Sequence, residues 1–228
     1  MQMRVLLLYL LILIPVSSFA QKIKPQKVAK LPSQIDESSG LGVADSNRLW
    51  TLNDAGGKNE LFLLDFKGAL LRTLLLSDFS NHDWEDLATD SSFLFIGDFG
   101  NNSNLRESLL VYKIAKSDME DSDHLIPQTI SFKYPDQRYF PPPPSNWNFD
   151  CEAFFHQGDS VYLFSKNLSN PNDGYTKMYR LPDSPWDYTA ELIDSEARNS
   201  PDRTDRLFHV SSLSYVQQPT KPAVLAQP

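Results

Sequence analysis

The sequence predicts an all-β fold built from repeated four-stranded sheets. Two observations carry this prediction. The apolar runs after residue 37 are short, rich in Val, Ile, Leu, Phe and Tyr, and separated by turn residues, which is typical of antiparallel hairpins. One pattern also occurs three times, at residues 36–57, 83–102 and 150–167: acidic residues open an apolar strand, and a second strand then runs into a polar loop.

The spacing of the repeats favours one architecture. Glu37, Glu85 and Glu152 mark the three copies and lie 48 and 67 residues apart. Such spacings suit the blades of a β-propeller with one long insertion. We therefore expect about three four-stranded blades plus a partial fourth, with residues 21–228 as the propeller domain.

The first 20 residues predict a signal peptide. Arg4 supplies a positive charge, residues 5–16 are apolar, and Ser18-Phe19-Ala20 fits the small-x-small rule for cleavage. The apolar run is shorter than the roughly 20 residues that span a bilayer, so a cleaved leader is favoured over an anchor. The sequence therefore predicts a secreted or periplasmic protein without a membrane span in the mature chain.

Hairpin turns divide the remaining chain into twelve expected strands. The first unit comprises residues 39–44, 48–52, 61–65 and 70–76. The second comprises residues 86–89, 93–97, 109–114 and 129–134, and the third 153–156, 161–165, 177–181 and 189–193.

Two insertions interrupt the units. Residues 116–124 are charged and predict either a short surface helix or a loop. Residues 136–148 contain four consecutive prolines, 141–144, which favour a stiff polyproline II segment across the surface. That segment would be either a rigid connection between blades or a docking site for an aromatic-lined groove.

A fourth repeat begins near the C-terminus. Residues 209–215 align with residues 36–42, and the pattern stops after residues 223–226. An incomplete blade would leave an apolar face and a bare sheet edge in water. The chain is therefore expected to be a fragment of a longer protein, or its partial blade closes with N-terminal strands into a four-bladed ring.

Charge and cysteine content exclude several classes of function. The formal net charge is −8, which disfavours binding to nucleic acid or anionic lipid. Cys151 is the single cysteine and cannot form an internal disulfide. Its acidic neighbours Asp150 and Glu152 raise a thiol pKa, so we expect a small apolar strand residue there and no nucleophile.

The repeat brings acidic residues together if the fold is a propeller. The first strand of every blade lines the central channel, so Glu37, Glu85 and Glu152 would form one ring. Asp54, Asp98 and Lys166 follow the second strands and would form a neighbouring ring at the rim. Clustered carboxylates repel one another, and a hard cation such as Ca²⁺ relieves that repulsion. Glu37, Asp54, Glu85, Asp98 and Glu152 are the candidate metal ligands, and Lys166 supplies a compensating charge.

Two other roles stay open for these carboxylates: capping of backbone N–H groups that holds the blades in register, and general acid–base catalysis. Trp147, in the proline-rich insertion, and Lys166 are the candidate ligand-binding residues. The four histidines lack zinc-ligand spacing, and no G-x-S-x-G sequence supplies a nucleophile. The sequence thus predicts a scaffold that binds a small ligand or an extracytoplasmic protein.

Three motifs carry a resemblance to known families. With Asp83-Trp84-Glu85-Asp86-Leu87-Ala88, Gly97-Asp98-Phe99-Gly100-Asn101-Asn102 and Asp150-Cys151-Glu152-Ala153, the chain resembles secreted bacterial β-propellers. The phytase-like propellers and the exported propellers of Bacteroidetes are similar over roughly residues 31–215. The resemblance implies calcium held by acidic residues at the top face. It also implies an alternative function, a calcium-dependent phosphoesterase in which Glu85 or Glu152 positions the attacking water.

Overall fold

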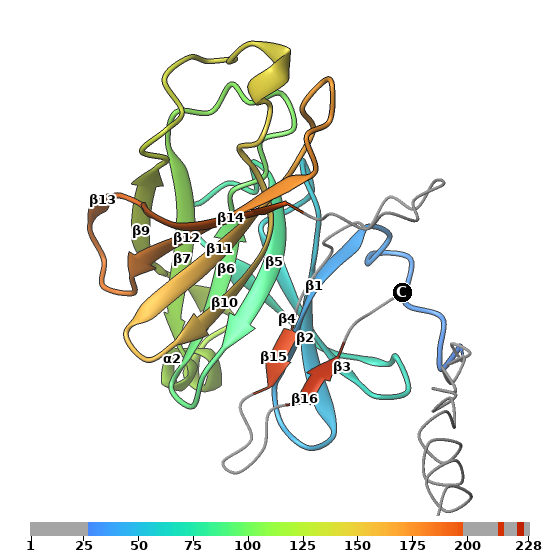
Figure 1. The fold of residues 1–228 in the computed structure, drawn as a ribbon. Helices are drawn as coiled ribbons and strands as arrows, with labels where there is room; N and C mark the ends of the chain where they lie inside the picture. Colours follow the sequence, from blue (N-terminus) through green and yellow to red (C-terminus); the bar gives the residue numbers. More distant parts are fainter. Residues whose placement is uncertain (1–26, 198–213, 217–222, 226–228) are drawn as a thin grey trace, which may run out of the picture.

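The structure, a computed structural model, describes residues 27–197, 214–216 and 223–225. Its sheets confirm the all-β prediction (Figure 1). The first sheet contains β1 (Ser38–Val43), β2 (Arg48–Asn53), β3 (Glu60–Asp65), β4 (Leu70–Leu76) and β8 (His124–Leu125). The second contains β5 (Trp84–Thr89), β6 (Phe93–Asp98), β7 (Leu109–Ala115), β9 (Gln128–Lys133) and β13 (Asp187–Thr189). The third contains β10 (Asp150–Gln157), β11 (Ser160–Lys166), β12 (Tyr175–Pro182) and β14 (Glu191–Ala197). The predicted leader lies outside the described residues.

Each of these sheets contains an antiparallel meander of four strands, as the sequence predicts. Local turn chemistry explains the hairpins. The Asp65 carboxylate accepts the backbone N–H groups of Lys67 and Ala69 at 2.9 and 2.8 Å, and Gly68 takes a φ of +79°. These contacts close the β3–β4 turn where the sequence places it.

Short parallel strands extend two of the sheets, which the sequence analysis did not predict. β8 pairs with β4, and β13 pairs with β9, so each belongs to the sheet that precedes it in the chain. The single strand predicted at residues 189–193 is therefore wrong. The strand is interrupted at Ala190, whose N–H donates a hydrogen bond to the Lys133 carbonyl at 2.9 Å. The residues before Ala190 belong to β13 in the second sheet, and those after it belong to β14 in the third sheet. The added strands cover exposed sheet edges.

The two insertions are also ordered. Of the alternatives for residues 116–124, the helix is correct for α2 (Lys116–Asp121), which buries Met119, whereas His124 starts β8. The polyproline II prediction is wrong beyond Pro143, because Pro144–Asn146 forms a 3₁₀ turn. The Trp147 indole N–H donates to the Pro142 carbonyl at 2.9 Å and fixes this turn.

The apolar core lies between neighbouring sheets. One buried cluster joins the first and second sheets and includes Trp50, as expected for a mid-strand residue. Another joins the second and third sheets and includes Cys151, which is fully buried on β10. Burial raises the pKa of the Cys151 thiol, and the Asp150 charge raises it further, in agreement with the sequence prediction.

The first strands of the three sheets lie side by side. β5 contacts both β1 and β10 and lies between them (Figure 1). Gly40 permits this approach, because a Cβ there would collide with the backbone of Asp86 and Leu87. The hairpin of β15 (Ser214–Val216) and β16 (Ala223–Leu225) falls in the predicted fourth repeat, and β15 contacts β1 and β5. No helix among the described residues is long and apolar enough to cross a membrane.

Candidate metal centre

A β-bulge near the start of each first strand shapes the candidate site. The register shifts between Trp84 and Asp86 on β5, and between Cys151 and Ala153 on β10. Glu85 and Glu152 are the extra residues of these two bulges. A bulge changes the direction of a side chain relative to the regular pleat. The two glutamates therefore meet between adjacent sheets.

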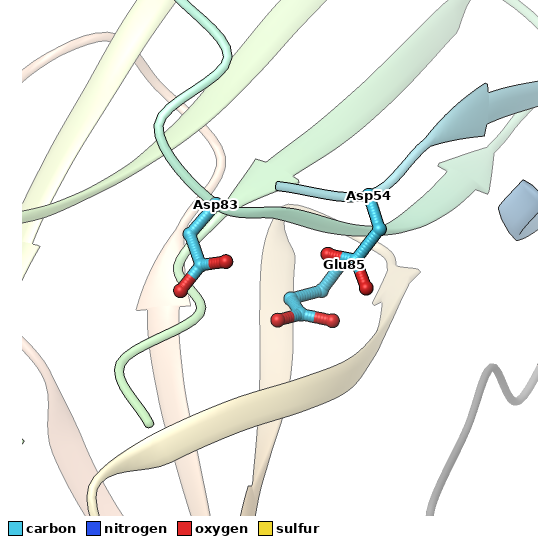
Figure 2. Close-up of side chains that lie close together, drawn as sticks. All are labelled: Asp54, Asp83 and Glu85. Carbon is cyan, nitrogen blue, oxygen red and sulfur yellow. The ribbon is translucent and has the colours of Figure 1, made fainter. Parts of the chain in front are cut away.

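Five carboxylates form what we call the acidic pocket. They make two groups that share Glu85, and within each group one carboxylate oxygen per residue lies within 4.8 Å of the others. The first group is Asp54, Asp83 and Glu85, whose carboxylates turn toward the same space (Figure 2). The second group is Glu85, Asp150 and Glu152.

Glu85 is the central member of the pocket. The residue is only 5% exposed, and no described residue donates a hydrogen bond to its carboxylate. Burial raises the pKa of Glu85 to about 10, and the charges of Glu152, Asp54, Asp83 and Asp150 contribute to the shift. A buried carboxylate without donors is stabilised either by a proton or by a cation.

Asp150 presents a second unsatisfied acceptor. Its Oδ1 accepts the N–H of Asn101 at 2.6 Å, whereas the fully buried Oδ2 has no hydrogen-bond donor in the part of the chain that the structure describes. Lys166 Nζ lies 3.9 Å from that oxygen, beyond hydrogen-bond distance. Burial raises the pKa of Asp150, and the neighbouring Glu152 raises it further.

Gly100 forms one wall of the acidic pocket. Its N–H donates to the Asp83 carbonyl at 3.1 Å, and a Cβ at this position would overlap the carboxylates of Asp83 and Glu85. Burial raises the pKa of the Asp83 carboxyl, and the Asp54 charge adds to that effect. The glycine therefore lets the loop pass directly over the carboxylates.

The structure brings together four of the residues singled out in the sequence. Asp54, Glu85 and Glu152 belong to the acidic pocket, and Lys166 Nζ lies 2.7 Å from Glu152 Oε1. They do not form the two separate rings expected, because Asp54 joins Glu85 instead of Asp98.

Glu37 belongs to neither carboxylate group. The bulge in β1 lies between Ser38 and Leu41, and Ser38 pairs with Asn53 as Trp84 pairs with Asp98. Ser39 therefore takes the position of Glu85, and its hydroxyl donates to the Glu85 carbonyl at 2.5 Å. The ring of three glutamates expected from the repeat is thus wrong at its first member.

Asp98 is also outside the pocket. It is fully buried, and its carboxylate contacts Arg106 at 2.8 Å, the Tyr112 hydroxyl at 3.2 Å and the His82 ring at 3.2 Å. Because these groups satisfy the Asp98 carboxylate, and Arg106 also bonds to the Asp98 and Gly100 carbonyls, Asp98 and Arg106 together hold the loop after β6 in place.

Trp147 lies away from the acidic pocket. Its neighbours Asn148 and Phe149 help line a separate cavity of about 370 Å³ between the proline-rich insertion and β12. Lys177 stands over the Phe149 ring there, 3.9 Å from the ring centroid, and pairs with Asp136 at 2.7 Å.

Two pocket residues, Asp83 and Asp150, were not among the predicted ligands. A signal for them was present, since each precedes its glutamate by two residues in Asp83-Trp84-Glu85 and Asp150-Cys151-Glu152. The shared acid-x-Glu spacing therefore marks both carboxylates of each pair.

No protein-family model matches the chain, and no curated protein is similar to it. Among solved structures 21 chains are similar. One is streptogramin B lyase, which is 12% identical with a TM-score of 0.40 over 69% of this chain and 40% of that chain. This chain thus spans well under half the length of the lyase, and the likeness is too distant to carry an argument.

Proposed function

We propose that the chain is a β-propeller scaffold whose acidic pocket binds one hard divalent cation, and that this cation is calcium. The observation that carries the proposal is the buried Glu85 carboxylate, which has no hydrogen-bond donor among the described residues and faces four further carboxylates. A bound cation offsets the mutual repulsion of these groups.

The propeller part of the proposal rests on the sheets themselves. Three consecutive four-stranded meanders place their first strands side by side, with β5 between β1 and β10. This is how the blades of a propeller surround a central channel, where loops from successive blades converge. The acidic pocket takes its carboxylates from all three meanders, around the first strands β5 and β10. We propose about three four-stranded blades plus a partial fourth, as the sequence predicts.

The oxygen-rich composition of the pocket supports a hard cation over zinc. Its potential ligands are the carboxylate oxygens of five acidic residues. Calcium takes six to eight oxygen ligands in flexible geometry, whereas zinc prefers four nitrogen or sulfur ligands. The cation would join the β5 glutamate to the loop after β2 and so stabilise the contact between two blades.

An exported location fits this proposal, because calcium outside the cytoplasm reaches the concentrations that modest sites of Kd about 10⁻⁴–10⁻³ M require. The partner we propose is a small ligand or an extracytoplasmic protein presented at the same rim. The calcium-dependent phosphoesterase stays an alternative prediction, which phosphate release from phytate or an aryl phosphate, with and without calcium, would test.

Thermal unfolding tests the cation site. A ligand that binds only the folded state raises the melting temperature, so calcium should raise it relative to EDTA. Glu85→Gln keeps the shape but removes a ligand charge and should abolish most of the shift. Glu107→Gln makes the same change at an exposed position and should leave the shift intact. Equal melting temperatures in calcium and EDTA for the unmodified protein would rule the cation out.

A further inference from the structure

The two halves of the acidic pocket differ in one respect. Among the described residues, no lysine or arginine lies within ion-pair distance of Asp54, Asp83 or Glu85, whereas the second half contains Lys166. Lys166 Nζ lies 2.7 Å from Glu152 Oε1 and 3.9 Å from Asp150 Oδ2. A positive charge therefore already stands between two of the three carboxylates that could hold an ion there.

Strand register explains the difference. Lys166 is the Cα partner of Asp150 at the open end of the β10–β11 pair. At the matching end of the β1–β2 pair, Asp54 follows Asn53, and its N–H bonds to the Glu37 carbonyl at 3.0 Å. The position after the second strand's last equivalent residue is thus a lysine, Lys166, in the third sheet and an aspartate, Asp54, in the first sheet. Both side chains reach the acidic pocket.

We propose that Lys166 is the resident counter-ion of the Glu85–Asp150–Glu152 group, so that the pocket accepts one divalent cation, at Asp54, Asp83 and Glu85, instead of two. This inference rests on the proposed cation site and specifies its stoichiometry. It predicts that a neutral residue at position 166 creates a second cation site.

Three physical points support the assignment. The ammonium is held in place, because its Nζ donates a hydrogen bond to Glu152 Oε1 at 2.7 Å and lies 3.9 Å from Asp150 Oδ2. Two positive ions that share one carboxylate repel each other strongly at this range. Asp150 Oδ2 is fully buried and has no hydrogen-bond donor among the described residues, so it is an acceptor that Lys166 does not reach and that a metal ion could use.

The test is the calcium stoichiometry of the full mature chain, measured by isothermal titration calorimetry after EDTA treatment and dialysis. We expect one calcium ion per chain for the unmodified protein and two for Lys166→Met. The double variant Lys166→Met/Glu152→Gln should return to one ion, because the new site loses a ligand. Lys166→Arg keeps the charge and should bind one ion.

Controls separate this effect from a general change in charge. Lys177→Met removes another ion-paired lysine, 2.7 Å from Asp136 and outside the pocket, and should leave the count at one. If Lys166→Met does not fold, Lys166→Gln, which is also neutral but keeps a hydrogen-bond donor, should give the count of two.

The outcomes distinguish the two claims. One ion for both the unmodified protein and the neutral variants would overturn the role of Lys166 and leave the proposed cation site standing. Two ions bound to the unmodified protein would likewise overturn the role of Lys166 and leave the proposed cation site standing. No binding to the unmodified protein or to any variant would overturn both.

Discussion

Asp86 on β5 accepts a hydrogen bond from the backbone N–H of Phe154 on β10, at 3.2 Å, and so ties the second sheet to the third. Its other oxygen accepts the N–H of Leu87 at 2.8 Å, and the residue is fully buried. One carboxyl group thereby satisfies two buried donors directly beneath the acidic pocket. This contact is the capping role that the sequence left open for its acidic residues, and it falls on Asp86, next to Glu85.

Replacement of Asp86 tests this contact. Asp86→Ala leaves two buried N–H groups without acceptors and should lower the free energy of unfolding by about 2–3 kcal/mol. Asp86→Asn keeps one oxygen acceptor but turns an NH2 group toward the second N–H, because Leu87 and Phe154 bond to different carboxyl oxygens. It should therefore lose about half as much as Asp86→Ala, about 1–1.5 kcal/mol. Urea unfolding in EDTA measures both, and equal losses for the two variants would contradict the capping role.

Glu85 should make the cation-free protein less stable as the pH rises. Its pKa rises from 4.5 to about 10 on folding, so between these values the folded state binds more protons than the unfolded state. The free energy of unfolding then decreases with pH, by up to about 1.4 kcal/mol per pH unit for one proton. Asp83 and Asp150, with raised pKa values of their own, add to this slope.

Glu85→Gln should therefore flatten the pH dependence and stabilise the cation-free protein above pH 7. Urea unfolding in EDTA at pH 6 and pH 9 measures the change in slope. A variant with the same slope as the unmodified protein would show that Glu85 ionises freely in the fold, and the need for a cation would disappear.

Gly100→Ala tests the shape of the acidic pocket without a change in charge. The new Cβ would overlap the Asp83 and Glu85 carboxylates and push them apart. We expect calcium affinity to fall at least tenfold, equivalent to about 1.4 kcal/mol. Gly57→Ala is the matched control, since a Cβ there meets its neighbours at ordinary contact distances of 3.5 Å or more. Equal calcium affinities in the two variants would contradict the placement of the site.

A buried charge cluster between the second and third sheets gives a prediction at low pH. The Asp183 carboxylate accepts hydrogen bonds from Lys113 at 3.0 Å and from His156 at 2.9 Å. Burial raises the pKa of Asp183, but these two partners outweigh burial and leave the pKa below its ordinary value of 3.8. The stability that Asp183 contributes is therefore present above pH 3.8 and is lost as the pH falls below it.

Asp183→Asn should lower the free energy of unfolding by about 1–2 kcal/mol at pH 7 and by much less at pH 2.5. Asp187→Asn, at an exposed position on β13, should have little effect at either pH. Should Asp183→Asn lose the same free energy at both pH values, the ion pairs would not be the source of the effect.

Local patterns predicted the strands well because hairpin turns and apolar runs are local. Residues 70–76 form a strand with the predicted bounds, and the other predicted strands of the first two units differ from the observed ones by one or two residues at either end. The failures depend on tertiary pairing. β8 and β13 are two and three residues long and exist only because neighbouring edges accept them. Nothing in their own residues indicates such pairing.

The candidate site was predictable in part for the same reason. Glu85 and Glu152 occupy equivalent bulges, so the repeat aligned them correctly. The repeat does not reveal the register of β1, which puts Ser39 in place of a third glutamate. Nor does it show that Arg106 takes up the charge of Asp98, eight residues away. These outcomes follow from register and loop geometry, which composition and spacing do not encode.

Anomalous diffraction from crystals of the mature chain soaked in a lanthanide, a heavy substitute for calcium, locates the cation directly. We expect the strongest peak in the acidic pocket, about 2.3–2.6 Å from carboxylate oxygens of Asp83 and Glu85. In Glu85→Gln crystals that peak should be lost or much weaker. A pocket without a peak while surface carboxylates bind the ion, or an undiminished peak in Glu85→Gln, would show that the acidic pocket is not a cation site.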